Sequence, residues 1–88
     1  MDAKQTEKIL KALANRRRLA ILKFLHKSRR ASVGDIAKEI KLSFKSTSRH
    51  LAVLRGADLM DREQINLVML YSLHEPPGPI LKAVLAIL

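Results

Sequence analysis

The sequence contains no cysteine and no tryptophan, and its 88 residues include two phenylalanines and one tyrosine. Without cysteine the chain has no disulfide, no thiolate metal ligand and no thiol redox switch, which is typical of a cytoplasmic protein. A core this poor in aromatics is built from Leu, Ile, Val and Ala, which favours helices. No apolar run approaches the roughly 18 residues of a membrane span, and the start MDAKQTEK is too polar for a signal peptide. We expect one domain over residues 1–88, located in the cytoplasm and not in a membrane.

Acidic residues are about half as frequent as basic ones, and none lies in a catalytic pattern. The sequence has no nucleophile–base arrangement, no glycine-rich phosphate loop and no paired acidic motif. His26, His50 and His74 lie far apart and have no second ligand at helical spacing, so each is expected to be an isolated histidine. The sequence therefore predicts no enzymatic activity, no cofactor and no metal.

The whole chain has a net charge of +9, and its basic residues are concentrated in the first two thirds. Residues 1–58 hold 15 Lys and Arg against 5 Asp and Glu, a balance of +10. Residues 59–88 hold 2 against 3, a balance of −1. Such a positive segment is expected of a nucleic-acid-binding protein, which neutralises phosphates, although ribosomal and membrane-surface proteins share it.

The stretch LSFKSTSRHLAVLRG, from Leu42 to Gly56, lies in this basic part and has helical periodicity. Four residues recur at three- and four-residue spacing and form one face: Phe44, Thr47, Leu51 and Leu54. Other faces carry hydrogen-bond donors: Lys45, Ser46, Ser48, Arg49 and Arg55. Ser43 is a good N-cap, which puts several donors in the first two turns. A helix anchored by its back suits the major groove of DNA, but a solvated surface helix shows the same pattern.

Three helices are predicted before this one and one after it. Ser32, followed by Asp35, and Asn15 are expected to cap two of them, and SRRAS before Ser32–Ile40 is predicted to be a loop. The short connection between the third and fourth helices makes a helix-turn-helix, although no glycine occupies the turn. The predicted ranges are residues 4–14, 16–27, 33–40, 43–56 and 79–88.

Arg16, Arg17 and Arg18 begin the second helix, where the helix dipole disfavours cations. Such a cluster indicates either contact with phosphate or salt bridges to carboxylates of a neighbouring helix. We predict a salt bridge for at least one of the three.

After Gly56, a glycine suited to end the fourth helix, the pattern becomes that of strands. Residues 67–73 alternate with a period of two, and residues 59–63 also look extended. Between them Asn66 is the residue that tolerates a left-handed conformation. A two-stranded hairpin that follows a helix-turn-helix is a wing.

The last helix follows the break at EPPGP and is apolar on nearly every side. A monomer this small cannot cover it, and burial against a second copy of the chain explains it better than a membrane does. We therefore predict a homodimer formed by the first and last helices. The residues expected in this contact are Ile9, Leu10, Leu13, Ile80, Leu81, Val84, Leu85 and Leu88.

These features resemble the ArsR family of winged helix-turn-helix repressors over about three quarters of the chain. The segment LANRRRLAIL is similar to the family's LadptRlrIL, with Arg18 on its arginine. SFKSTSRHLAVL resembles sqstvSrHLkvL, the pattern of the recognition helix, with Ser48, His50 and Leu51 on its most characteristic letters. Tyr71 stands where the family's wing often has tyrosine.

The resemblance implies a fold of about five helices with a two-stranded wing, and a dimer that binds a palindromic operator in double-stranded DNA and blocks transcription. The helix 43–56 would lie in the major groove. His50 would contact a phosphate or pack beneath the helix, and Thr47 would be buried. The residues that would approach base edges are Lys45, Ser46, Ser48 and Arg49.

The chain departs from the family at the metal sites. Many members sense metal through a cysteine pair in the third helix, where this chain has Ser32 and Gly34. Others use carboxylates and histidines of the last helix, and residues 78–88 contain neither. Metal sensing by either route is therefore not expected.

The wing departs too, because Asn66 takes the usual glycine position and Leu67 replaces a basic residue. Arg62 is the remaining cation of the wing and joins Arg55 among the predicted DNA-binding residues, although Asp61 and Glu63 beside it oppose phosphate. The alternative to a sequence-specific regulator is an architectural winged helix that binds any duplex, or a module that binds another protein.

Overall fold

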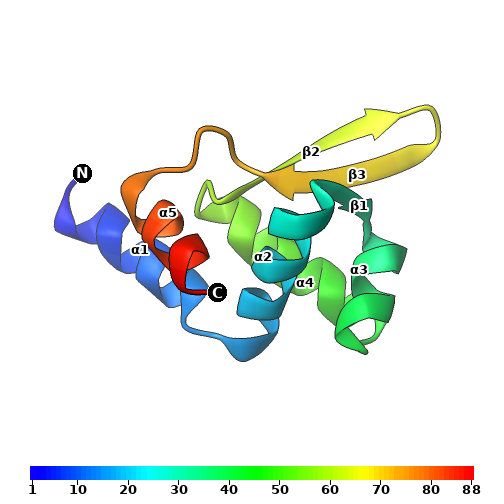
Figure 1. Cartoon of the computed structure of the whole chain (residues 1–88), viewed down its shortest axis with the longest axis horizontal. Coiled ribbons are helices and arrows are strands. Elements are labelled where there is room, and N and C mark those ends of the chain that lie inside the picture. Colours follow the sequence, from blue (N-terminus) through cyan, green and yellow to red (C-terminus); the bar gives the residue numbers. More distant parts are fainter.

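The computed structural model describes all 88 residues, which form five helices and a three-stranded antiparallel sheet (Figure 1). The predicted fold class, mainly helical with a small hairpin, is confirmed, and every helix lies within a residue or two of its predicted range. The helices are α1 (Ala3–Leu13), α2 (Arg16–Ser28), α3 (Val33–Ile40), α4 (Phe44–Gly56) and α5 (Pro79–Ile87). The strands are β1 (Arg30–Ser32), β2 (Met60–Ile65) and β3 (Val68–Leu73).

Polar side chains fix where the first four helices begin. In each case the side-chain oxygen of the N-cap residue accepts a hydrogen bond of 2.8–3.2 Å from the backbone N–H three residues later. Such a cap contributes about 0.5–2 kcal/mol, because it satisfies a donor that the helix itself leaves free. The capping residues are Asp2, Asn15, Ser32 and Ser43, of which the last three were predicted.

Left-handed residues, none of them glycine, make the tight connections. Lys41 (φ 56°) makes the turn between α3 and α4, for which the sequence offers no glycine. Asn66 (φ 58°) makes the hairpin turn, as predicted. Gly56 is the last residue of α4 but is not left-handed; Asp58 (φ 59°), two residues later, takes that conformation instead. The helix therefore ends at Gly56 as predicted, but the left-handed conformation that follows a helix end is taken by Asp58 instead of by the glycine.

The segment SRRAS, predicted to be a loop, contributes the strand β1. Arg30–Ser32 pairs antiparallel with β3, so that the strand order is β1-β3-β2 and the predicted two-stranded wing has a third strand at its base. Ala31 lies opposite Tyr71, and both are buried. Three residues are too few to show the alternation that identifies a strand, and pairing with β3 decides their conformation. The hairpin turn also falls later than predicted, because Gln64 and Ile65 belong to β2.

The core gathers around α2, and the back of α4 contributes to it. Thr47, Leu51 and Leu54 are fully buried, as the helical periodicity predicts. The Thr47 hydroxyl donates a 2.7 Å hydrogen bond to the carbonyl of Ser43, so its polar atom is satisfied inside the core. Phe44 does not join this face, and its side chain is 63% exposed. It is the first residue of α4, beside the turn, where no other element covers it.

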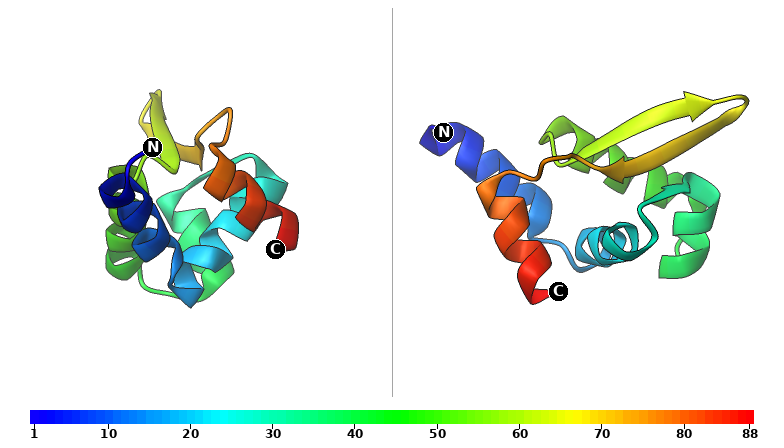
Figure 2. Two further views of the ribbon diagram at one scale, coloured as in Figure 1. Left: turned by 90° about the vertical axis from the view of Figure 1, so that its left-hand side faces the viewer. Right: turned by 45° about the horizontal axis from the view of Figure 1, so that its top comes forward.

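The two ends of the molecule differ in the elements they present. The tip of the hairpin and the α3–α4 turn lie toward one end of the long axis, and α1 and α5 lie beside one another toward the other (Figures 1 and 2). Residues of α1 and α5 line a common pocket, which confirms that the two helices are neighbours.

We expect the protein to be destabilised when a buried side chain on the back of α4 is truncated. Leu51→Ala removes a fully buried side chain and should lower the free energy of unfolding by about 2–5 kcal/mol. Chemical denaturation followed by circular dichroism measures this. The matched control is Leu67→Ala, because Leu67 is 95% exposed and its truncation should change the stability by less than about 0.5 kcal/mol. Similar losses in both variants would contradict this description of the core.

Candidate nucleic-acid interface

The front of α4 presents polar side chains away from the core. Lys45 and Arg49 are exposed, whereas Ser46 and Ser48 are half-buried. The buried residues on the back of α4 anchor it in the core. α3 packs against α4, and the turn at residues 41–43 joins the two helices. Because the back cannot rotate out of the core, the front of the helix always faces away from it.

The cations of α4 have no carboxylate partner within the chain. One side-chain contact has the geometry of an ion pair, 3.0 Å between His74 Nδ1 and Asp61 Oδ2, and it lies on the hairpin side. Lys45, Arg49 and the half-buried Arg55 form no salt bridge, so their charges are available to an external anion. Lys45 and Arg55 are ten residues apart, about 15 Å along the helix, so they cannot contact the same phosphate.

The remaining predicted DNA-binding cation, Arg62, lies on a different element. It is exposed in the middle of β2, opposite Tyr71 of β3, and the exposed Asp61 and Glu63 flank it. The tip of the hairpin beyond it is apolar, with Leu67 almost fully exposed. The structure thus brings the predicted residues of α4 together on one helix but leaves Arg62 apart on the wing.

Arg18 of α2 contacts both α1 and α4, which the sequence did not predict. Its Nε donates to the carbonyl of Ala12, and Nη2 donates to the carbonyl of Lys11 at 3.3 Å, both at the end of α1. Its Nη1 lies 3.3 Å from Nδ1 of His50 on α4. The predicted salt bridge for at least one of the three arginines is wrong, because none of them pairs with a carboxylate; Arg18 pairs with carbonyl oxygens and an imidazole instead.

The free carbonyl groups at the C-terminal end of α1 explain why Arg18 pairs with carbonyl oxygens. The last carbonyls of a helix lack intrahelical partners and carry partial negative charge, which favours a cation there. Only two residues separate α1 from α2, so the first turn of α2 reaches these carbonyls directly. The signal in the sequence was a cluster of arginines immediately after a helix end in a chain with few carboxylates. The contact with His50, 32 residues away, left no such signal.

The Arg18 contact determines the chemical state of His50. A guanidinium has only donors, so Nδ1 of His50 must accept, and the proton of the neutral ring lies on Nε2. Burial, and then the charges of Arg18 and Arg17, lower the pKa of His50 below its usual value. The half-buried imidazole is therefore neutral at pH 7 and has one N–H left to donate.

We expect this histidine to make the fold sensitive to acid. The folded state holds the neutral ring and the unfolded chain binds the proton more readily, so stability should be lost as the pH falls below about 7, through the unfolded-state pKa of His50 and toward its lower folded-state pKa. The denaturation midpoint should fall more in the wild type than in His50→Gln, which does not titrate. Equal pH dependence in both proteins would contradict this assignment.

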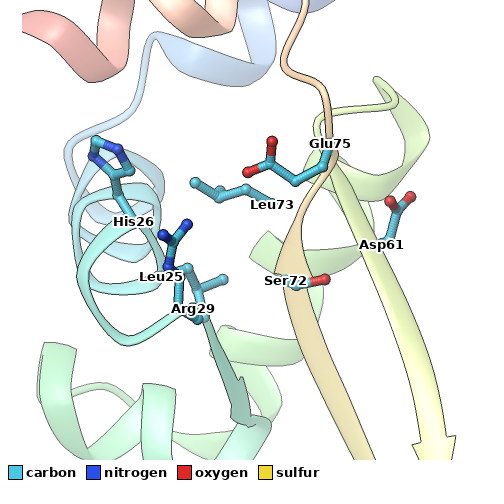
Figure 3. A pocket seen from close by; sticks show the side chains of 7 residues that line it. All are labelled: Leu25, His26, Arg29, Asp61, Ser72, Leu73 and Glu75. Carbon is cyan, nitrogen blue, oxygen red and sulfur yellow. The ribbon is translucent and has the colours of Figure 1, made fainter.

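A polar pocket of about 270 Å³ lies away from these residues, between the end of α2 and the base of the hairpin (Figure 3). Arg29, which follows the last residue of α2, and Glu75, which follows β3, both point into it, from opposite sides. None of the predicted DNA-binding residues lines it. The chain contains no group of three or more His, Cys, Asp or Glu side chains that could hold a metal ion.

The predicted dimer residues divide into two groups in the folded chain. Three of them are buried in the chain's own core: Ile9, Leu13 and Leu81. The others remain half-buried or exposed: Leu10, Ile80, Val84, Leu85 and Leu88. Leu10 is 51% exposed. An apolar surface on α1 and α5 is thus left after the core has formed.

This architecture, a helix-turn-helix followed by a β-hairpin, defines a winged helix-turn-helix protein. None of the five helices has the length and hydrophobicity that crossing a membrane requires. The family described as bacterial regulatory protein, arsR family, matches residues 15–62, which is more than half of the chain. The chain belongs to this family, as the resemblance in its sequence predicted. It is a transcriptional regulator, so the prediction that it is not an enzyme is confirmed.

Individual relatives agree with this membership. The HTH-type transcriptional regulator YgaV of Escherichia coli is 37% identical over 72 residues, which are 82% of this chain and 73% of YgaV. The homodimeric winged helix-turn-helix DNA-binding domain Mb0332 of Mycobacterium bovis superimposes with a TM-score of 0.81 at 26% identity, covering 96% of this chain and 74% of that one. The transcriptional repressor PagR of Bacillus anthracis superimposes with a TM-score of 0.80 at 26% identity, covering 96% and 92%.

Proposed function

We propose that this regulator is a homodimer that binds double-stranded DNA in a sequence-specific manner, with α4 in the major groove, and represses transcription. Residues 1–88 act in this proposal as one DNA-binding domain whose first and last helices form the dimer. The observation that carries the proposal is the front of α4, where donors and unpaired cations stand on a helix with a fully buried back.

The polar side chains of α4 fall into two groups, one suited to contact base edges and the other to contact phosphates. Lys45, Ser46, Ser48 and Arg49 lie in the first two turns, and the N-terminal turns of a recognition helix reach base edges. Arg49 can donate two hydrogen bonds to the O6 and N7 atoms of guanine. Arg55 at the far end of α4 suits a phosphate, which positions the helix without reading sequence. Arg62, flanked by carboxylates, has a smaller part, and most of the selectivity falls on α4.

The dimer is proposed because of the apolar surface that remains on α1 and α5. The related Mb0332 domain is described as homodimeric. In a two-fold dimer the two copies of α4 would enter successive major grooves about 34 Å apart, which requires a palindromic site. Repression is proposed because the similar PagR is a repressor and because a dimer covering a palindrome excludes other proteins from it.

Selection of fragments from a random duplex pool tests this function. We expect an enriched palindrome, to which Arg49→Ala binds about 1–3 kcal/mol more weakly, with little change for unrelated duplex. Lys23→Ala is the control, because it removes the same charge from an exposed position of α2 and should leave the preference intact. Equal affinity for every duplex with a steep salt dependence would show an architectural protein instead. Absence of any duplex affinity at low salt would refute the proposal.

The dimer is tested separately by light scattering at micromolar concentration. Leu10→Glu places a charge on the α1 surface without touching the core, and a two-fold interface contains the change twice. We expect the dissociation constant to rise by roughly a hundredfold or more. Leu67→Glu makes the same exchange at the hairpin tip and should remain dimeric. A wild-type protein that is a stable monomer would contradict the dimer.

A further inference from the structure

We infer that Arg18 is a positioning residue for DNA binding: it holds His50 so that the imidazole offers its Nε2–H to a DNA phosphate, and it ties α4 to the end of α1. This inference rests on the proposed function, because it names a further residue that the DNA contact requires. Arg18 itself is not proposed to touch DNA. It acts through the ring of His50.

Arg18 is held at both ends, which makes it a rigid support. Its backbone N–H donates to the side chain of Asn15 at 3.1 Å, and its guanidinium reaches the carbonyls of Lys11 and Ala12. The guanidinium is planar, so fixing Nε and Nη2 on these carbonyls also fixes the direction of Nη1. Nη1 is the atom that meets His50, at 3.3 Å from Nδ1.

The support selects one form of the imidazole. Nδ1 must be unprotonated to accept from Arg18, so the single proton of the ring is on Nε2. Protonation of Nδ1 would set two donors against each other. The charged groups that act on the ring are Arg18 and Arg17, both from α2. On the other side of Arg18, Lys8 and Lys11 of α1 share a groove with it and add further positive charge. Burial, Arg18 and Arg17 all lower the pKa of His50, and no carboxylate is among the groups that shift it, so the neutral form is favoured.

The position of His50 makes this form useful. It follows Arg49 directly and precedes the fully buried Leu51, so it lies at the edge between the donor-bearing front of α4 and the core. The ring is half-buried, so Arg18 does not enclose it completely. A neutral imidazole whose direction is already fixed loses little conformational entropy when its N–H meets a phosphate oxygen.

The same contact links the dimer surface to the recognition helix. α1 carries Leu10 on the surface proposed for dimerisation, and the carbonyls of Lys11 and Ala12 follow it directly. A shift of the end of α1 would move the Arg18 guanidinium and, through it, His50. Pairing of two chains would in this way hold the phosphate contact in place on both recognition helices.

Two amide substitutions separate the roles of the two ring nitrogens. His50→Gln places an amide N–H near the position of Nε2, and His50→Asn places an acceptor oxygen near that of Nδ1. We expect His50→Gln to bind the selected duplex within about threefold of the wild type. His50→Asn should bind about tenfold more weakly, the equivalent of one lost hydrogen bond. Equal losses in both variants, or a larger loss in His50→Gln, would overturn the phosphate contact.

The contact between Arg18 and His50 is tested first by spectroscopy of the free protein and then by duplex binding. Nitrogen-15 spectra of the imidazole should show an unprotonated Nδ1 and a protonated Nε2 at pH 7.5 in the wild type. In Arg18→Gln, whose folding is verified by circular dichroism, we expect a mixture of tautomers, a raised histidine pKa and, as in His50→Gln, binding of the selected duplex that is weaker by no more than about threefold. A wild-type ring protonated on Nδ1, or a ring unchanged by Arg18→Gln, would overturn the inference.

These outcomes are distinguishable from a failure of the proposed function. If the wild type selects no duplex, the function fails, whereas the spectra still decide whether Arg18 sets the tautomer. If the wild type selects a palindrome but His50→Gln binds no better than His50→Asn, the function stands and the phosphate contact is wrong.

Discussion

Burial of α2 is the constraint on which the rest of the molecule depends. Ile21, Leu22 and Leu25 are essentially inaccessible, and α2 contacts α1, α3, α4, α5, β1 and β3. In a chain of 88 residues this leaves little apolar surface for a second core. The same few side chains of α2 therefore hold the helix-turn-helix, the sheet and the terminal helices in one arrangement. These contacts also fix the orientation of α4.

Much of this arrangement is predictable from the sequence, because it follows from local patterns. The helical spacing of Thr47, Leu51 and Leu54 identifies the buried face of α4, and Ser43 identifies its start. Asn66 identifies the hairpin turn because few residues accept its backbone conformation. In each case the signal lies within a few residues of the feature it determines.

The features that escaped prediction depend on partners far away in the sequence. β1 exists because β3, some forty residues later, offers its edge, and three residues carry no periodicity of their own. Arg18 pairs with carbonyl oxygens, which have no residue identity and so leave no trace in the sequence. Phe44 has the spacing of a buried residue, but its place in the first turn of α4 puts it beyond the elements that cover Thr47. Periodicity in the sequence shows which residues lie on the same face of a helix, but it does not show how far along the helix that face is covered by other elements.

The strand order gives the unusual composition of β2 a physical meaning. β2 is an outer strand of the sheet, and four consecutive residues along it, Asp61 to Gln64, are exposed and polar or charged. An outer strand has unpaired N–H and C=O groups that can template the addition of another chain, and charged side chains along it make that addition unfavourable. Asp61 and Glu63, which oppose the approach of a phosphate to Arg62, therefore also make the addition of another chain along the β2 edge of the sheet unfavourable.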